Sequence, residues 1–216
     1  MVFYFHKLMG AFSAILLSLL VNISTSSADS QTNDDPMYFA LSGGLSIADV
    51  SKTANTNGQA LANALGQTVL VEYDRASWAG RLTGGYEISD SVNLEVGYFM
   101  SGDIDITYSI PGVSASESYS ASGFDFAVKY DFEDSGLFAK VGLHNSDLDA
   151  RVSVSLSGST VASAAASSSG TGTMIGAGFE RKDANGDVTF FGYDLYMDIG
   201  DVAGADFGYL YYGWRF

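Results

Sequence analysis

The chain has 216 residues, a formal net charge of −15, no cysteine, two histidines and 25 glycines. Its acidic balance argues against a nucleic-acid partner. The missing cysteines exclude disulfides, zinc–thiolate sites and thiol catalysis, and two histidines are too few for a histidine-rich metal site. The length and the 47% of hydrophobic residues indicate one folded domain. No cofactor is expected.

Residues 1–28 read as a cleaved secretory signal peptide. Lys7 supplies a short basic region, the apolar run 8–21 is short for a spanning helix, and small residues precede the expected cleavage after Ala28. An uncleaved anchor is the alternative. Residues 29–36 follow as a short polar N-terminal lead-in, and the chain is expected to leave the cytoplasm.

The remaining sequence alternates between apolar and polar residues with a period of two, which is typical of strands. In 92–100, for example, the even positions are valine, leucine, valine, tyrosine and methionine, whereas Glu95 lies on the opposite parity. Eight such strands are expected, at about 37–47, 77–88, 92–102, 123–132, 136–146, 171–182, 188–199 and 206–216.

The connections between these strands alternate in length. Tight turns are expected at 89–91, 133–135 and 183–187, and longer loops at about 48–76, 103–122, 147–170 and 200–205. This alternation is typical of outer-membrane barrels, in which the short turns face the periplasm and the long loops are extracellular. Within the loops, 58–71 is a candidate short helix, and 103–122 and 147–170 are candidate strand extensions that form a rigid stalk.

The distribution of charge favours a membrane barrel over a soluble secreted barrel or sandwich, which remains the alternative. In the middle of each strand the charged residues lie on the parity opposite the apolar one, and a cation facing lipid near the midplane costs about 2–4 kcal/mol. Large aromatic residues gather near both strand ends, as two interface belts would require. The expected belt residues are Trp78, Tyr98 and Phe124 at the outer end, and Tyr86, Tyr130, Phe132, Phe179 and Trp214 at the periplasmic end. We therefore predict that 37–216 form an all-β, eight-stranded antiparallel up-and-down transmembrane β-barrel.

Charged side chains on the inward parity predict an ion-pair network that fills the lumen, because charges removed from water need partners. A tight turn at 133–135 places Lys129 opposite Lys140, so we expect a carboxylate such as Glu95 or Asp131 between them. An interior of eight strands is just wide enough for side chains; a narrow gated pore is the alternative. The expected network comprises Arg81, Glu87, Glu95, Asp125, Lys129, Asp131, Lys140, Asp194, Asp198 and Arg215.

The last strand resembles the C-terminal signal of outer-membrane proteins, in which a terminal aromatic follows alternating apolar or aromatic residues. Leu210, Tyr212, Trp214 and Phe216 match that pattern. In strand number and size, 37–216 resembles the small eight-stranded outer-membrane β-barrels: the OmpA-like transmembrane domain, OmpX and the opacity-type surface proteins. The resemblance implies a Gram-negative outer membrane, outer-membrane lipid as surroundings and recognition by the barrel-assembly machinery.

One short motif bears on catalysis. His144, Asn145, Ser146 and Asp147 resemble the His-x-Ser-Asn motif of small barrels that deacylate lipid A, although aspartate stands in place of the final asparagine. No acid is assignable as the third member of a triad, so we expect a polar histidine at the barrel rim and no enzyme activity.

The sequence therefore predicts a structural or surface-interacting protein of the adhesion type. Its long extracellular loops would contact a host, a phage or a neighbouring cell. A narrow gated pore for porin-like transport of small solutes is the first alternative, and a lipid A-modifying enzyme is the second.

Overall fold

The computed structural model describes residues 36–132, 135–183, 187–202 and 205–216. These ranges belong to one compact unit, Pro36–Phe216. The expected signal peptide and nearly all of the lead-in lie outside the described residues. Among the described residues, none of the helices has the length and hydropathy needed to cross a bilayer.

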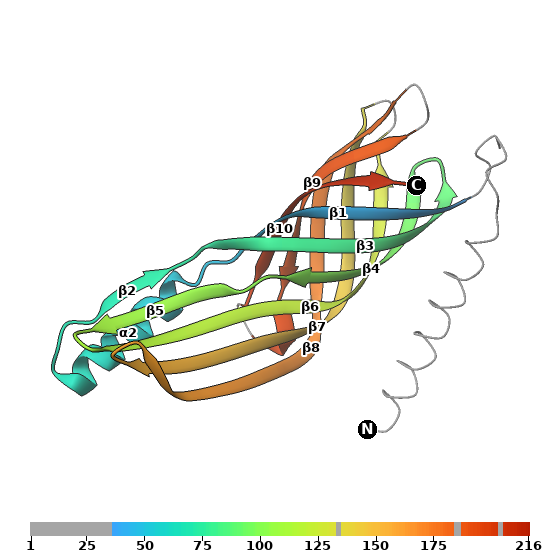
Figure 1. Cartoon of the computed structure of the whole chain (residues 1–216). Coiled ribbons are helices and arrows are strands. Elements are labelled where there is room, and N and C mark those ends of the chain that lie inside the picture. The colour runs from blue at the N-terminus through green and yellow to red at the C-terminus, as the bar shows by residue number, and fades with distance from the viewer. Residues whose placement is uncertain (1–35, 133–134, 184–186, 203–204) are drawn as a thin grey trace, which may run out of the picture. The chain divides into compact units, whose positions relative to one another are not determined.

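Eight strands form a closed antiparallel ring, which confirms the predicted fold (Figure 1). The ring closes where β1 pairs with β10, from Ala40↔Arg215 to Ile47↔Gly208, and where β6 pairs with β7. Every ring strand thus has a hydrogen-bonded neighbour on both sides, the arrangement that satisfies backbone groups in hydrocarbon. The ring strands are β1 (Met37–Ile47), β3 (Ala76–Ser89), β4 (Val92–Ser101), β6 (Val113–Asp131), β7 (Leu137–Leu156), β8 (Ser159–Lys182), β9 (Val188–Met197) and β10 (Phe207–Arg215).

Three ring strands continue beyond the ring and form a second region, here called the extension. β6, β7 and β8 remain paired out to Val113↔Leu156 and Leu156↔Ser159. β5 (Ile104–Ile110) adds to β6, and β2 (Leu70–Tyr73) adds to β5. The segments expected as loops at 103–122 and 147–170 are therefore strands over most of their length, with glycine turns at Gly112 (φ 81°) and Gly158 (φ 85°).

A helix, α2 (Ser51–Leu65), packs on this sheet. Its Ala54 is fully buried and forms one cluster with Ile106 and Tyr108 of β5. The helix ends at Gly66, which has the left-handed conformation and donates its backbone N–H to the Ala62 carbonyl. The helix predicted at 58–71 therefore exists, but it begins earlier and ends earlier, because Gly66 terminates it before Val69.

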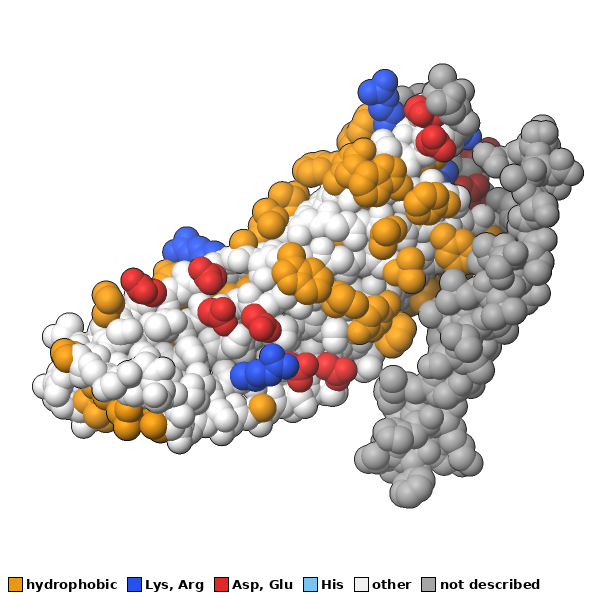
Figure 2. Space-filling view, viewed as in Figure 1, with side chains coloured by type: hydrophobic (Ala, Val, Ile, Leu, Met, Phe, Trp, Pro, Cys, Tyr) orange, Lys and Arg blue, Asp and Glu red, His pale blue; other side chains and the backbone are white. Residues whose placement is uncertain are grey.

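The ring strands expose one parity and bury the other, as the period of two predicts. On β6, Phe126 and Val128 are exposed, whereas Ala127 between them is fully buried. Figure 2 shows hydrophobic side chains over the ring strands and charged side chains over the extension and over the opposite end of the ring. That opposite end, where a tight connection joins β3 to β4 between Ser89 and Val92, is here called the turn end. The inward side chains form one aromatic-rich core that includes Phe99, Phe138, Met174, Tyr196, Phe207, Tyr209 and Tyr211.

Candidate functional site

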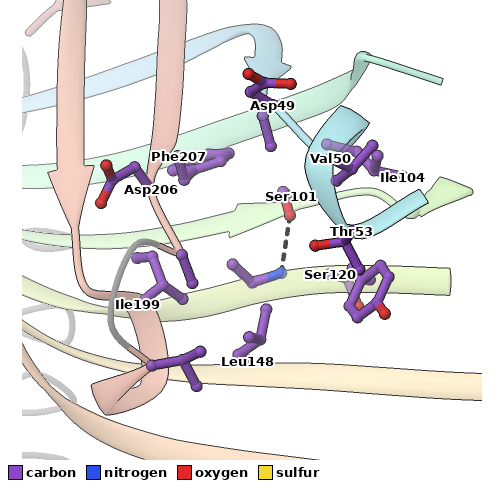
Figure 3. Close-up of a pocket in the computed structure, with 15 residues that line it drawn as sticks. Asp49, Val50, Thr53, Ser101, Ile104, Ser120, Leu148, Ile199, Asp206 and Phe207 are labelled. Atoms are coloured by element: carbon purple, nitrogen blue, oxygen red, sulfur yellow. Dashed lines mark hydrogen bonds between the residues drawn. The ribbon is translucent and has the colours of Figure 1, made fainter. Parts of the chain in front are cut away.

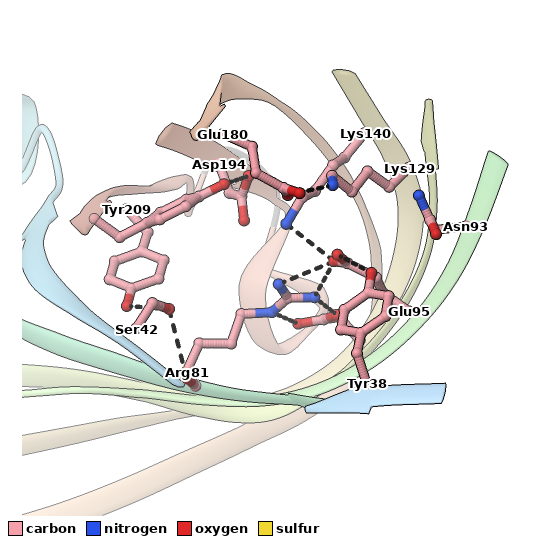
Figure 4. Close-up of polar contacts among 12 residues, drawn as sticks. Tyr38, Ser42, Arg81, Asn93, Glu95, Lys129, Lys140, Glu180, Asp194 and Tyr209 are labelled. Carbon is pink, nitrogen blue, oxygen red and sulfur yellow. Dashed lines mark hydrogen bonds and ion pairs between the residues drawn. The ribbon is translucent and has the colours of Figure 1, made fainter. Parts of the chain in front are cut away.

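Arg81 of β3 lies at the centre of the barrel interior and binds carboxylates from two strands (Figure 4). Its Nε donates to Oδ2 of Asp125 at 2.9 Å, and its Nη2 donates to Oδ1 of the same carboxylate at 2.5 Å, so the pair is bidentate. Glu95 lies 3.3 Å from Arg81 and also 2.9 Å from Lys140. Because all four side chains are buried, this cluster holds strands β3, β4, β6 and β7 in one register.

A second cluster lies toward the turn end of the barrel. Lys129 contacts Asp131 at 2.8 Å and Glu180 at 2.7 Å. Glu180 also lies 3.4 Å from Arg215, which in turn lies 3.3 Å from Glu87. Glu180, which was not among the predicted network residues, therefore bridges Lys129 of β6 and Arg215 of β10.

Lys129 and Lys140 are directly opposite each other in the register of β6 and β7, as the tight turn predicts. Each ammonium group has its own carboxylate: Glu95 for Lys140, and Asp131 with Glu180 for Lys129. Both nitrogens also lie over the Phe138 ring, at 4.9 and 5.2 Å from its centroid. The repulsion between Lys129 and Lys140 is thus offset by a carboxylate partner for each ammonium group.

Two of the predicted network residues differ from the rest. Glu87 is exposed at the turn end, where it reaches Arg215. Asp198 is exposed and lies outside the interior: it follows β9 with a φ of 58°, and its N–H donates to Asp206. The prediction of Asp198 as a lumen residue was wrong because the chain leaves the strand after Met197 and turns into the short 3-10 helix η1 (Ile199–Asp201).

The polar groups that sequence reasoning missed are tyrosines of the inward parity. Tyr38 donates to Glu95 at 2.9 Å, Tyr196 donates to Asp125 at 3.1 Å, and Tyr211 donates to Asp194 at 3.0 Å. Asp194 is fully buried. Alternation places Tyr196 on the parity of Asp194 and Tyr211 on the parity of Arg215. The strand of Tyr38 carries no charged residue, so its sequence held no such signal.

His144 and Ser146 of β7 lie close together but deep below the surface. Nδ1 of His144 is 3.1 Å from the Ser146 hydroxyl, and Nε2 is 2.9 Å from the Met197 carbonyl. That hydroxyl also accepts the Gly200 N–H at 3.1 Å. Ser146 is fully buried and His144 is 2% exposed. His144 thus lies toward the end of the ring, near the expected rim, but η1 folds over this end of the barrel and covers the pair.

The predicted belt aromatics point outward. Trp78, Tyr86, Phe124, Tyr130, Phe132, Phe179 and Trp214 are exposed by 43% to 56%. Tyr98 is less exposed, because its ring packs on Phe124 at 4.9 Å between centroids.

The terminal strand closes the ring. Tyr212 and Trp214 are exposed and pack on each other at 5.0 Å, while Leu210 is half-buried on the same parity. Phe216 is 78% exposed, and its backbone N–H donates to the Phe39 carbonyl at 2.7 Å. The predicted signal residues thus form an outward row on the strand that seals β1 to β9.

An apolar pocket of about 340 Å³ opens at the mouth of the ring, beside the extension (Figure 3). Ile104, Tyr119, Leu148, Ile199 and Phe207 provide its apolar lining. Its hydroxyl-bearing residues include Ser101, which accepts the Ala121 N–H at 2.9 Å. Sequence reasoning did not find this pocket, because its lining comes from five separate segments of the chain.

The described residues contain no cluster of His, Cys, Asp and Glu suited to hold a metal ion. Their buried carboxylates are instead engaged by arginine, lysine and tyrosine. The interior is therefore arranged as a packed structural network.

No protein-family model and no curated relative matches the chain. Among solved structures it is similar to Ail, the attachment invasion locus protein of Yersinia pestis, in complex with the heparin analogue sucrose octasulfate. That match has 14% identity and a TM-score of 0.45, and it covers 83% of this chain and 99% of Ail. Neisserial surface protein A matches with 18% identity and a TM-score of 0.40, covering 84% of this chain and 96% of that chain. The N-terminal β-barrel domain of Pseudomonas aeruginosa OprF matches with 14% identity and a TM-score of 0.43, covering 84% and 98%.

At these TM-scores the fold assignment rests on the chain's own topology. The class of protein follows from three features: a closed eight-stranded antiparallel ring, an apolar outer surface with aromatic residues near its ends, and mid-strand charges that face the interior. Together they define a small transmembrane β-barrel of the outer-membrane type.

Proposed function

We propose that this chain is an integral outer-membrane protein whose barrel is a closed scaffold and whose extension is a surface-interaction platform of the adhesion type. The observation that carries the proposal is the continuation of β6, β7 and β8 beyond the ring into a sheet covered by α2. Functional surfaces commonly lie on projections held by a rigid scaffold. This projection is itself hydrogen-bonded sheet, so it would present a fixed surface.

The turn end would face the periplasm and the extension would face outward, after export directed by the signal peptide. Outer-membrane lipid would surround the apolar face, and the barrel-assembly machinery would recognise the terminal strand ending at Phe216. A host cell, a phage or a neighbouring cell would supply the ligand of the extension.

The filled interior favours this role over a narrow pore. The two ion-pair clusters and the aromatic core occupy the cross-section of the barrel, and an eight-stranded interior is of the width that side chains fill. A role as a lipid A-modifying enzyme is disfavoured because Ser146, the only nucleophile beside His144 in the motif, is fully buried. We therefore propose a protein without catalytic activity.

The test removes the far part of the β7–β8 hairpin. Residues 152–164 are replaced by an Asn-Gly turn, which joins Arg151 to its paired neighbour Ala165. Cells that display this variant should lose adherence to epithelial cells or to sister cells, relative to cells that display the full chain in equal amounts. The control is Asp90→Asn, which changes an exposed charge at the turn end. Equal adherence of the shortened and the full protein would contradict the proposal.

A further inference from the structure

The pocket at the mouth of the ring has a closed floor. Phe207 and Ile199 form this floor and are 5% and 1% exposed. Below them, the rings of Phe99 and Tyr196 pack against that of Phe207, with centroids 6.0 and 5.6 Å from it. The pocket is therefore a cup that ends on the aromatic core and does not continue into the lumen.

The walls of the cup are held in place by hydrogen bonds of the fold itself. The Tyr119 hydroxyl donates to Glu117 at 2.8 Å, and the N–H of Ile199 donates to the Ala205 carbonyl at 2.9 Å. Both backbone groups of Gly200 in η1 are hydrogen-bonded: its N–H donates to the Ser146 hydroxyl at 3.1 Å, and its carbonyl accepts the Ser168 hydroxyl at 2.7 Å. A cup with fixed walls is preorganised, so a ligand would pay little for ordering it.

The charged residues among the described lining are both acidic. Asp49 stands before α2 and Asp206 stands before β10, and Figure 3 draws Phe207 between them. Asp49 accepts the Ser51 N–H at 3.1 Å, and the Ser51 hydroxyl holds the pKa of the Asp49 carboxyl below its usual value. Arg75 also acts on Asp49 electrostatically, but its guanidinium donates to the Tyr73 hydroxyl at 3.0 Å.

We propose that this cup is a binding site for a small cationic amphiphile, such as an aryl or alkyl amine. Its apolar body would lie on Ile104, Leu148 and Phe207, and its ammonium group would lie between Asp49 and Asp206. A volume of about 340 Å³ is at the lower end of ordinary ligand pockets and accommodates a bicyclic arene with a short amine. Both carboxylates are exposed to solvent at the rim of the cup, so their attraction for a cation should be moderate and sensitive to salt.

The test compares three probes of one shape: 1-naphthylmethylamine as the cation, 1-naphthalenemethanol as the neutral probe and 1-naphthylacetate as the anion. Each is titrated into the full protein in lipid nanodiscs, with empty nanodiscs as the blank for partition into lipid. We expect saturable binding of the cation with a Kd about tenfold lower than that of the neutral probe. Saturable binding of the anion is not expected. Added salt should weaken binding of the cation alone.

Two kinds of variant tie this binding to the cup. Asp49→Asn with Asp206→Asn removes the charges but keeps the oxygens that accept the Ser51 and Asp198 N–H groups, and it should abolish the preference for the cation. Leu148→Trp should fill the cup and weaken binding of every probe. Asp90→Asn, an exposed charge at the turn end, should leave binding unchanged, and resistance of unboiled protein to detergent should show that each variant is folded.

Three outcomes would overturn the proposal: equal affinity for the cation and the neutral probe, no saturable binding beyond that of empty nanodiscs, or an effect of Asp90→Asn as large as that of the double substitution. None of these outcomes bears on adhesion by the extension, which is measured separately with the shortened hairpin.

Discussion

Glu95 is the anion on which the barrel interior depends most, because it meets three groups from three different strands. It contacts Arg81 and Lys140 and accepts the hydroxyl of Tyr38. Removing one partner from a buried ion pair leaves an uncompensated charge. The size of that effect depends on burial, which allows a comparison with an exposed carboxylate of the same type.

Glu95→Gln should lower the free energy of unfolding by about 3–5 kcal/mol. Glu87→Gln should lower it by less than about 1 kcal/mol, because Glu87 pairs with Arg215 at the exposed turn end. Reversible urea unfolding in lipid vesicles, followed by tryptophan fluorescence, measures both. Similar losses for the two variants would show that Glu95 is not part of a buried network.

Gly85 gives a second prediction at this scale. A Cβ at Gly85 would overlap the ring of Tyr38, whereas a Cβ at Gly80 would meet only the Ser42 carbonyl oxygen at 3.7 Å. Gly85→Ala should therefore displace Tyr38 from Glu95 and destabilise the barrel by about 1–3 kcal/mol, and Gly80→Ala should be nearly neutral. Urea unfolding in lipid vesicles measures both losses of stability. Equal losses for the two substitutions would contradict the close packing of the Tyr38 ring on Gly85.

Among the elements, α2 packs on the extension and not on the barrel interior. Its buried Ala54 lies on Ile106 and Tyr108 of the extension. Because this contact lies outside the barrel interior, α2 should be separable from the barrel by a single substitution.

Ala54→Asp buries an unpaired charge and should detach α2, while the barrel keeps its resistance to detergent. Asn55→Asp adds the same charge at an exposed position and should leave α2 in place. Hydrogen exchange of the backbone amides in 51–65 reports the difference. Slow exchange in the Ala54→Asp variant would contradict the packing described.

Some of these elements could be predicted from the sequence, and others could not. Alternation predicted the ring strands and their inward parity, because a one-residue slip would bring Lys129 or Arg81 to the lipid face. It also indicated strand extensions within 103–122 and 147–170, and these segments are strands over most of their length. It did not predict the pairing of β2 with β5, which joins residues far apart in the sequence. The burial of His144 and the position of Asp198 depend on η1, whose fold comes from contacts with distant β7 and β8 rather than from its own three residues.

At the scale of the whole molecule, the barrel is filled inside and apolar outside. The filled interior has a direct electrical consequence. The purified protein in planar bilayers should give no stable single-channel conductance, because Arg81, Lys140 and the aromatic core occupy the lumen. Regular, stepwise conductance at moderate voltage would favour the narrow gated pore.

The central claim is that the outward parity contacts lipid and the inward parity does not. Phe126 and Phe99 test it, since Phe126 is 49% exposed on the ring's outer face and Phe99 is 1% exposed in its core. In a background with Trp78→Phe and Trp214→Phe, each is replaced by tryptophan in turn, and the protein is placed in vesicles of lipids brominated on the acyl chains. We expect strong quenching of fluorescence for Phe126→Trp and little for Phe99→Trp. Equal quenching, or the reverse order, would contradict the assignment of the outward parity to lipid.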